Sequence, residues 1–286
     1  QHLYCEGFLS NGIQGGLTAI AGGIASSLKK DQIVVNFIGD GTLGEGLLYE
    51  SLNLSSKWNL PVLYVLENNQ VAQTTSIGQT VSGTIRGRSD AFGIKFFESD
   101  VRDLKSLDYT LKLATKFVRE KRQPILMEIS TYRMGAHSKG DDNRDDKILN
   151  EINSKDLLNI AINKNIINSD EVKVIKDNIL KITKKCLKAK TLTSVKKYYP
   201  VTFSENITFL PLKKNYKKKF IKLINNGLEN IFNKYPSLLM IGEDIEDANE
   251  YFCKDYGGAF KASKGLSKKF PGRIVNTPIS EAAIVG

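Results

Sequence analysis

Two short apolar runs near the start of the chain each end in a group of small or oxygen-bearing side chains. Residues 33–38 lead directly into Gly39-Asp40-Gly41, and residues 62–66 lead into Glu67-Asn68-Asn69. Runs of this length, rich in Val, Ile and Leu, are typical of strands buried on both faces of a sheet. The sequence therefore predicts two buried strands with polar residues at their carboxyl ends.

Segments with helical spacing alternate with these runs. We expect helices at 17–29, 44–57 and 103–121, and a third strand at 125–130. This alternation predicts an α/β fold, with a parallel sheet covered by helices on both faces. Ligands of such sheets bind beyond the carboxyl ends of the strands. Asp40, Asn69 and the loop after Tyr132 are therefore expected to converge.

The chain is expected to contain two domains. We assign residues 1–184 to the first domain, 185–214 to a basic linker, and 215–286 to the start of a second α/β domain. Residues 154–190 predict two helices. The second domain predicts helices at 216–233 and near 261–270, with strands at 238–241 and 273–275. Because the chain lacks an initial Met and ends within this pattern, we expect a fragment truncated at both ends.

The charge distribution argues against a nucleic-acid-binding surface across the whole chain. The net charge is +10, but thirteen lysines and one glutamate fall between Lys181 and Lys222, so the remainder is close to neutral. A solvated linker explains such a run most simply, with an acidic partner or nucleic acid as alternatives. No stretch approaches the roughly 18 apolar residues of a membrane span. Three scattered cysteines predict neither disulfides nor a zinc site, which fits a cytoplasmic protein.

Asp40 and Asn69 carry oxygen ligands of the kind that Mg²⁺ prefers. Mg²⁺ takes hard oxygen ligands in near-octahedral geometry and commonly joins protein to phosphate groups. The Asp40 carboxylate, the Asn69 amide oxygen and the Val71 backbone carbonyl would form the protein half of such a site. The glycines beside Asp40 allow close approach of the backbone, and a helix beginning near Gly44 would offer N–H groups to an anion. These residues predict a magnesium–diphosphate clamp.

Two other interpretations fit parts of the same stretch. Gly39-x-Gly41-x-x-Gly44 matches the glycine fingerprint of dinucleotide sites, with Glu67 placed as a ribose-binding acid. Asp40 argues against this interpretation, because a carboxylate facing a pyrophosphate is repelled unless a cation lies between them. In a purely structural interpretation, Asp40 caps a helix and the asparagines form turns. Both alternatives stay open on these residues alone.

Further motifs surround the clamp. They are Gly-Asp-Gly-Thr-Leu-Gly-Glu-Gly (39–46), Glu50-Ser-Leu-Asn53, Trp58-Asn-Leu-Pro61 and Glu67-Asn-Asn69, together with Gly12-Ile-Gln-Gly15 upstream and residues 131–138 downstream. Together they resemble the alpha part of the thiamine-diphosphate-dependent decarboxylating component of 2-oxo acid dehydrogenase complexes. This group includes the pyruvate, branched-chain and acetoin dehydrogenases.

The second half of the chain carries a separate set of motifs. They are Ile241-Gly-Glu-Asp244, Tyr256-Gly-Gly258, Lys264-Gly-Leu266 and Asn276-Thr-Pro-Ile-Ser-Glu281. These residues resemble the start of the beta part of the same enzymes. The two resemblances occur in the expected order, so the chain is identified as an alpha part fused to the beginning of a beta part.

The resemblance implies roles for the matched residues. Asp40 and Asn69 would bind Mg²⁺ by side chain and Val71 by its carbonyl, while Gly41 and Thr42 would lie along the diphosphate. Gly12 and Gln14 would contact the aminopyrimidine through backbone atoms. His137 would lie near the phosphates or the reacting centre, and Glu281 would hydrogen-bond the aminopyrimidine ring. The implied cofactors are thiamine diphosphate and Mg²⁺.

Glu281 has a clear chemical logic in that role. The cofactor must lose a proton from its thiazolium carbon to become a nucleophile. A carboxylic acid bonded to a pyrimidine ring nitrogen favours the imino tautomer, whose exocyclic nitrogen can take that proton. Without the resemblance, Glu281 would be interpreted as an acidic residue at a helix start capped by Ser280.

The loop after Tyr132 departs from the family pattern. The family usually carries a second His two positions before His137, where this chain has Gly135. His2 is assigned a structural hydrogen bond, and Ser138, which stands where some members are phosphorylated, is interpreted as a loop residue. Arg144 lies among aspartates and is expected to order the loop through surface ion pairs, each worth about 0–1 kcal/mol.

The resemblance implies oxidative decarboxylation of a 2-oxo acid, followed by transfer of the acyl unit to a lipoyl group on a partner acyltransferase. A transketolase-like or other carboligating enzyme is the first alternative. A degenerate paralogue acting as a basic scaffold through residues 181–222 is the second. Family members divide the cofactor between two domains, so a homodimer of the complete protein is expected. The 286 residues alone are expected to show weak or no turnover.

Overall fold

The computed structural model describes residues 3–138, 142, 144–190, 219–247, 256–277 and 279. The chain divides into two compact units, one of Gln1–Lys155 with Phe220–Gly286 and one of Asp156–Lys219. The predicted domain boundaries at 184 and 214 stay predictions, because the second of them lies outside the described residues. Among the helices of the described part, none is both long enough and apolar enough to cross a membrane.

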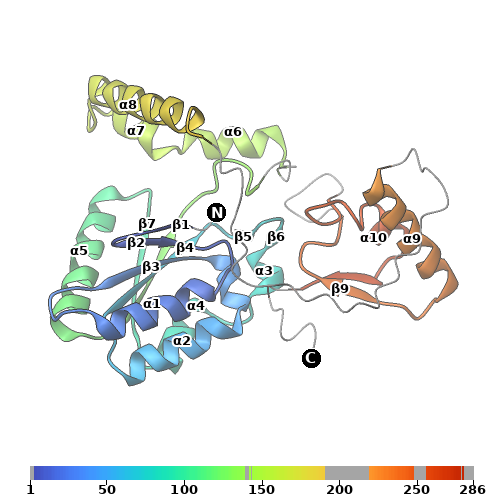
Figure 1. Cartoon of the computed structure of the whole chain (residues 1–286), viewed down its shortest axis with the longest axis horizontal. Helices are drawn as coiled ribbons and strands as arrows, with labels where there is room; N and C mark the ends of the chain where they lie inside the picture. Colours follow the sequence, from blue (N-terminus) through green and yellow to red (C-terminus); the bar gives the residue numbers. More distant parts are fainter. Residues whose placement is uncertain are drawn as a thin grey trace. The chain divides into compact units, whose positions relative to one another are not determined.

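A four-stranded parallel sheet forms the centre of the first unit (Figure 1). Its strands, in spatial order, are β3 (Val34–Gly39), β4 (Val62–Asn68), β8 (Ile125–Ser130) and β7 (Lys95–Asp100). Gly39 pairs with Glu67, and Glu67 pairs with Ile129, so the carboxyl ends of the three strands lie at one edge. This arrangement confirms the predicted α/β fold and brings Asp40 and Asn69 to the same edge. Strand β3 is an outermost strand with Val35 and Phe37 exposed, so the prediction that it is buried on both faces was wrong.

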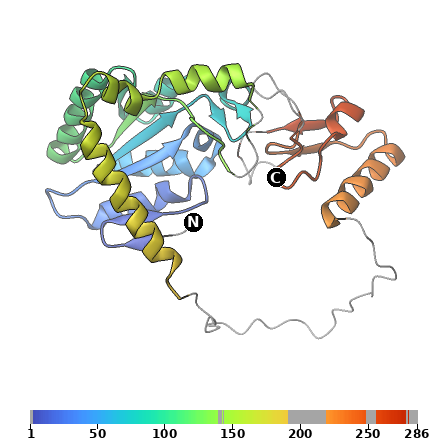
Figure 2. The ribbon, with the colours of Figure 1, turned by 90° about the horizontal axis from the view of Figure 1, so that it is seen from above.

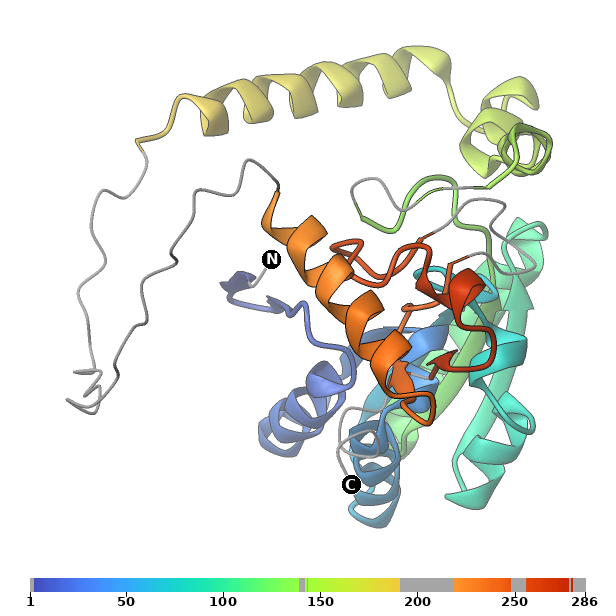
Figure 3. The ribbon, with the colours of Figure 1, turned by 90° about the vertical axis from the view of Figure 1, so that its right-hand side faces the viewer.

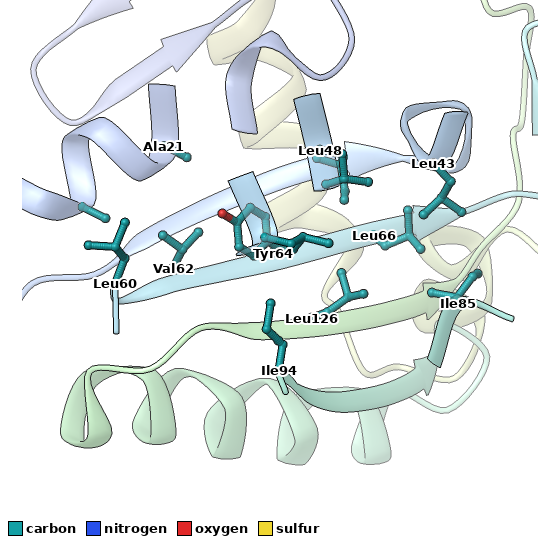
Figure 4. Packing of buried hydrophobic residues seen from close by; sticks show 13 residues of the cluster. Ala21, Leu43, Leu48, Leu60, Val62, Tyr64, Leu66, Ile85, Ile94 and Leu126 are labelled. Carbon is teal, nitrogen blue, oxygen red and sulfur yellow. The ribbon is translucent and has the colours of Figure 1, made fainter. Parts of the chain in front are cut away.

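Helices cover both faces of the sheet, as predicted. On one face α1 (Gly16–Ser27), α2 (Gly46–Lys57) and α4 (Ile85–Ala91) contribute to a core that includes Leu48, Tyr64 and Leu126 (Figure 4). The Tyr64 hydroxyl shares a 2.7 Å hydrogen bond with Ser55, and burial raises the pKa of Tyr64 to about 12. This bond satisfies a polar atom that would otherwise be costly to bury.

On the other face α5 (Leu104–Lys121) buries Ala114 and Val118 against β4 and β8. The Asp103 side chain caps the helix by accepting the Ser106 N–H at 3.0 Å. Strand β7 is an outermost strand of the sheet, and the sequence did not predict it. Three of its six residues are charged, namely Lys95, Glu98 and Asp100, so its apolar pattern is too weak to recognise.

Short elements complete the amino-terminal part of the first unit. They are β1 (Leu3–Cys5), β2 (Phe8–Ser10), the 3₁₀ helix η1 (Asp40–Gly44), β5 (Val71–Ala72), β6 (Thr75–Ser76), α3 (Ile77–Thr80) and α6 (Asp146–Ser154). The β5 and β6 strands form an antiparallel hairpin directly after Asn69 and Gln70. In the second unit, α7 (Leu157–Asn163) and the long α8 (Ser169–Leu187) match the two predicted helices (Figure 2).

The carboxyl-terminal segment of the first unit is a smaller α/β arrangement (Figure 3). It contains α9 (Phe220–Lys234), β9 (Met240–Gly242), α10 (Leu266–Lys269) and β10 (Ile274–Asn276), with β9 and β10 paired in parallel. Phe232, Leu266 and Ile274 form its core. Helix α10 is shorter than predicted, because Lys261 and Gly265 adopt left-handed backbone conformations.

Candidate functional site

Asp40 stands immediately beyond β3, at the start of η1, and its side chain is only 3% exposed. One carboxylate oxygen, Oδ1, accepts the Gly41 N–H at 3.0 Å, whereas the buried Oδ2 has no hydrogen-bond partner. Burial raises the pKa of Asp40, and the backbone N–H groups of Gly41, Asp40 and Val71 and the Arg133 guanidinium oppose the rise. A buried carboxylate oxygen without a donor is suited to a cation.

Asn69 and Val71 follow β4 and lie next to Asp40. The Val71 N–H donates to Asn69 Oδ1 at 3.1 Å, and the same N–H lies close enough to Asp40 to lower its pKa. Strand β5, which begins at Val71, packs against η1. The structure therefore brings together all three residues predicted to bind Mg²⁺.

Gly41 lies at a closely packed part of the clamp region. A Cβ on Gly41 would stand 3.0 Å from Ala72 Cβ and 3.0 Å from Ile279 Cδ1. These distances are shorter than ordinary carbon contacts, so even alanine would displace a neighbour. Glu281 lies outside the described residues, but Ile279, two positions earlier, contacts the clamp region directly.

A side-chain hydrogen bond between Gln14 and Thr42 joins the loop before α1 to η1. The Thr42 hydroxyl, which is fully buried, donates to Gln14 Oε1 at 2.6 Å. Gly12 lies two residues earlier on an exposed loop that leads into α1. Helix α2 begins at Gly46 and not near Gly44, because residues 40–44 form η1. The predicted helical N–H donors next to Asp40 are therefore replaced by those of η1.

The donor set fits a cation that also binds phosphate oxygens. Among the described residues, no cluster of three or more His, Cys, Asp or Glu side chains is placed to hold a metal. Asp40 supplies one carboxylate, and the Asn69 amide oxygen and the backbone of Val71 lie beside it. Mg²⁺ commonly completes such a small protein set with water and phosphate oxygens.

His137 is exposed on the loop after β8, and its role stays a prediction. The same loop is held by Arg144, which pairs with Asp142 through Nε–Oδ1 and Nη2–Oδ2 contacts of 2.8 and 2.7 Å. Arg144 also donates to the carbonyls of Arg133 and Gly135. The expected ion pair of Arg144 with a neighbouring aspartate is confirmed, but it does not lie on the surface, because the Arg144 side chain is 5% exposed.

Replacing Arg144 by alanine should loosen the loop that carries His137. The change removes two carbonyl contacts and leaves the Asp142 carboxylate without its cation, which should lower the free energy of unfolding by about 2 kcal/mol. Proteolysis within residues 131–138 and urea unfolding would measure both effects. Arg102→Ala is the matched control, because Arg102 makes a similar forked pair with Asp100 but is 64% exposed. Equal effects of the two substitutions would contradict this role for Arg144.

Several polar residues near the clamp were not predicted. Asn68 is buried, donates to Glu128 Oε1 at 2.7 Å and accepts from the Gln70 side chain at 2.8 Å. Arg133 Nη1 donates to the Gln73 carbonyl at 2.6 Å, which joins the loop after β8 to the β5–β6 hairpin. A polar residue directly after a buried strand was a usable signal for Asn68. The partners of Arg133 depend on tertiary structure alone.

A cavity of about 380 Å³ lies beside the clamp and not over it. Asn68, Gln70, Glu128, Arg86 and Glu98 are among the residues that line it. Asp40, Asn69 and Val71 do not line this cavity. It is therefore distinct from the predicted cofactor site in the described part of the chain.

The comparison with known families bears directly on these residues. The sequence profile of the family described as dehydrogenase E1 component matches residues 5–197. The chain belongs to this family. The matched region includes every described residue of the predicted clamp and the loop of His137. Residues 198–286, which carry the beta-like motifs, lie beyond the match.

Relatives of the chain include subunits of one enzyme from bacteria and mammals. The pyruvate dehydrogenase E1 component subunit alpha of Rickettsia felis is 31% identical over 189 residues, covering 62% of this chain and 58% of the relative. That of Rickettsia bellii is 34% identical over 135 residues, covering 46% and 41%. The mitochondrial somatic form of Bos taurus is 30% identical over 186 residues, covering 61% and 47%. The chain thus spans about half the length of the curated relatives it matches.

Proposed function

We propose that this E1-family chain binds thiamine diphosphate through Mg²⁺ and takes part in oxidative decarboxylation of a 2-oxo acid. The observation that supports this proposal most strongly is the buried, partnerless Oδ2 of Asp40, placed beside Asn69 and Val71 at the carboxyl edge of the sheet. The names of the relatives, which are pyruvate dehydrogenase subunits, agree with it.

The protein residues would hold the cofactor, and the cofactor would supply the carbanion chemistry. Asp40, Asn69 and the Val71 carbonyl would bind Mg²⁺, while Gly41 would lie along the diphosphate. Gln14, on the loop before α1, and Thr42, in η1, are proposed to line the cofactor. Glu281 is proposed to hold a proton at the aminopyrimidine, and His137 to approach from the loop after β8.

We also propose the remaining parts of the family's reaction for this protein. The acyl unit would pass to a lipoyl group of a partner acyltransferase, and two copies of the complete protein would share the active sites. The fusion of alpha-like and beta-like parts and the cytoplasmic location stay predictions. The basic-scaffold alternative depends on residues 181–222, and positions 191–218 of that stretch lie outside the described residues.

Cofactor binding and turnover together test this function. Isothermal titration of the 286-residue chain with thiamine diphosphate should give binding with Mg²⁺ present and little binding with EDTA. The full-length protein should reduce an artificial electron acceptor when given pyruvate or a branched-chain 2-oxo acid. Activity only with ketose donors would favour the transketolase-like alternative. Binding of nucleic acid without any cofactor binding would favour the scaffold.

A further inference from the structure

The beta-like segment contacts the hairpin that carries Val71. Asp244, in the Ile241-Gly-Glu-Asp244 motif, accepts three hydrogen bonds at Oδ1 from the β5–β6 hairpin. The donors are the Thr74 N–H at 3.3 Å, the Thr74 hydroxyl at 2.7 Å and the Thr75 hydroxyl at 2.5 Å. Asp244 and both threonines are 2–3% exposed, so water does not compete for these bonds.

Two further motifs of the same segment contact the hairpin. The Gln73 side chain donates to the hydroxyl of Tyr256, the first residue of the Tyr256-Gly-Gly258 motif. Asn276 Nδ2 lies 3.5 Å from the Thr75 hydroxyl oxygen. Three motifs recognised from sequence, separated by 12 and 20 positions, therefore meet on one turn of the alpha-like part.

The backbone of Asp244 is itself fixed. Asp244 adopts a left-handed conformation with φ of 54°, and its carbonyl accepts the Gly258 N–H at 2.9 Å. Gly257 permits this close turn, because a Cβ there would stand 2.1 Å from the Lys264 nitrogen. The backbone that presents the Asp244 carboxylate is thus held by this hydrogen bond to Gly258.

The β5–β6 hairpin connects the residues bound by Asp244 to Val71. Thr75 pairs with Ala72, and Ser76 pairs with Val71, in the two-stranded β5–β6 ladder. The Ile77 N–H closes the base of the hairpin on the Gln70 carbonyl at 2.9 Å. A shift of Thr74 and Thr75 therefore moves the strand that begins at Val71, whose N–H donates to Asn69 Oδ1 and lies beside Asp40.

We propose that Asp244 is a positioning residue of the metal clamp. By holding Thr74 and Thr75, it fixes the β5–β6 hairpin so that the Val71 carbonyl is directed at the Mg²⁺ bound with the diphosphate. This inference rests on the proposed function, because the clamp is its target. It makes tight Mg²⁺ binding depend on docking of the beta-like segment.

Hydrogen exchange of the cofactor-free 286-residue chain tests the structural step by itself. Asp244→Ala should speed exchange of the Val71–Ser76 amides by about tenfold or more, because these amides would open locally. Asp244→Asn keeps an acceptor oxygen and should have a smaller effect. Asp247→Ala is the matched control: Asp247 is equally buried, and its bonds to the Gly265 N–H and the Ser267 hydroxyl stay within the beta-like segment. Wild-type exchange of the hairpin in Asp244→Ala would overturn the proposal.

The Mg²⁺ requirement for thiamine diphosphate binding tests the functional step. The half-saturating Mg²⁺ concentration should rise about tenfold in Asp244→Ala and stay near wild type in Asp247→Ala. The Thr74→Val, Thr75→Val double variant removes the two hydroxyl donors from the hairpin side and should also raise the half-saturating Mg²⁺ concentration. It replaces Asp244→Ala as the test if Asp244→Ala folds poorly. An unchanged Mg²⁺ requirement in both Asp244→Ala and the threonine double variant would overturn the positioning role. If the wild-type chain binds no thiamine diphosphate, the proposed function fails, while the exchange result still decides whether Asp244 holds the hairpin.

Discussion

Replacing Asp40 by asparagine should weaken Mg²⁺-dependent binding of thiamine diphosphate by about 100-fold or more. The substitution keeps the shape of the side chain but removes the charge that a divalent cation needs at the buried Oδ2. Isothermal titration at fixed Mg²⁺ would measure the loss. Asp108→Asn, which neutralises an exposed carboxylate on α5, is the matched control and should leave the affinity unchanged.

The same substitution should stabilise the metal-free protein by on the order of 1 kcal/mol at neutral pH. Burial raises the pKa of Asp40 in the folded state above the ordinary 3.8. The folded state therefore binds this proton more tightly than the unfolded state does. Stability from this group is present below pH 3.8 and is lost as pH rises through the raised pKa.

Urea unfolding across this pH range would show a slope in the wild type that is smaller in Asp40→Asn. Adding Mg²⁺ with thiamine diphosphate at neutral pH should then stabilise the wild type and have little effect on the variant. An Asp40→Asn variant that binds the cofactor with wild-type affinity would exclude Asp40 as a metal ligand.

Replacing Leu66 by alanine should lower the free energy of unfolding by about 2–5 kcal/mol. Leu66 is fully buried near the carboxyl end of β4, in the same core cluster as Ile38 and Leu43. Truncation would leave a cavity under the strand that ends at Asn68. Urea denaturation would measure the loss, with Leu113→Ala as control because Leu113 on α5 is 40% exposed. A loss below about 1 kcal/mol would mean that this end of the sheet repacks easily.

The fold was predictable where burial imposes a simple pattern on the sequence. Strands β4 and β8 are covered on both sides in the central part of the sheet, so their apolar runs are continuous and their positions were predicted closely. Strand β7 was missed because it lies at an edge and carries Lys95, Glu98 and Asp100. An outermost strand needs only partial burial, so it can carry charged side chains as β7 does, although the other outermost strand, β3, keeps an apolar run.

The candidate site was predictable to the extent that it follows from sheet topology. Asp40 and Asn69 each follow a parallel strand, so their convergence needed no knowledge of side-chain packing. The burial of Arg144 and the contact of Asp244 with Thr74 could not be predicted in this way. Asp244 and Thr74 are 170 positions apart, and hydrogen-bond geometry between such residues depends on the folded structure.

The central claim is that Asp40, Asn69 and Val71 together bind the cation of a diphosphate cofactor. Crystals grown with thiamine diphosphate and Mn²⁺, which scatters anomalously in place of Mg²⁺, would test it most directly. We expect one anomalous peak about 2 Å from Asp40 Oδ2, Asn69 Oδ1 and the Val71 carbonyl oxygen. A bound cofactor with its cation on other protein atoms, or with no peak at Asp40, would contradict the claim.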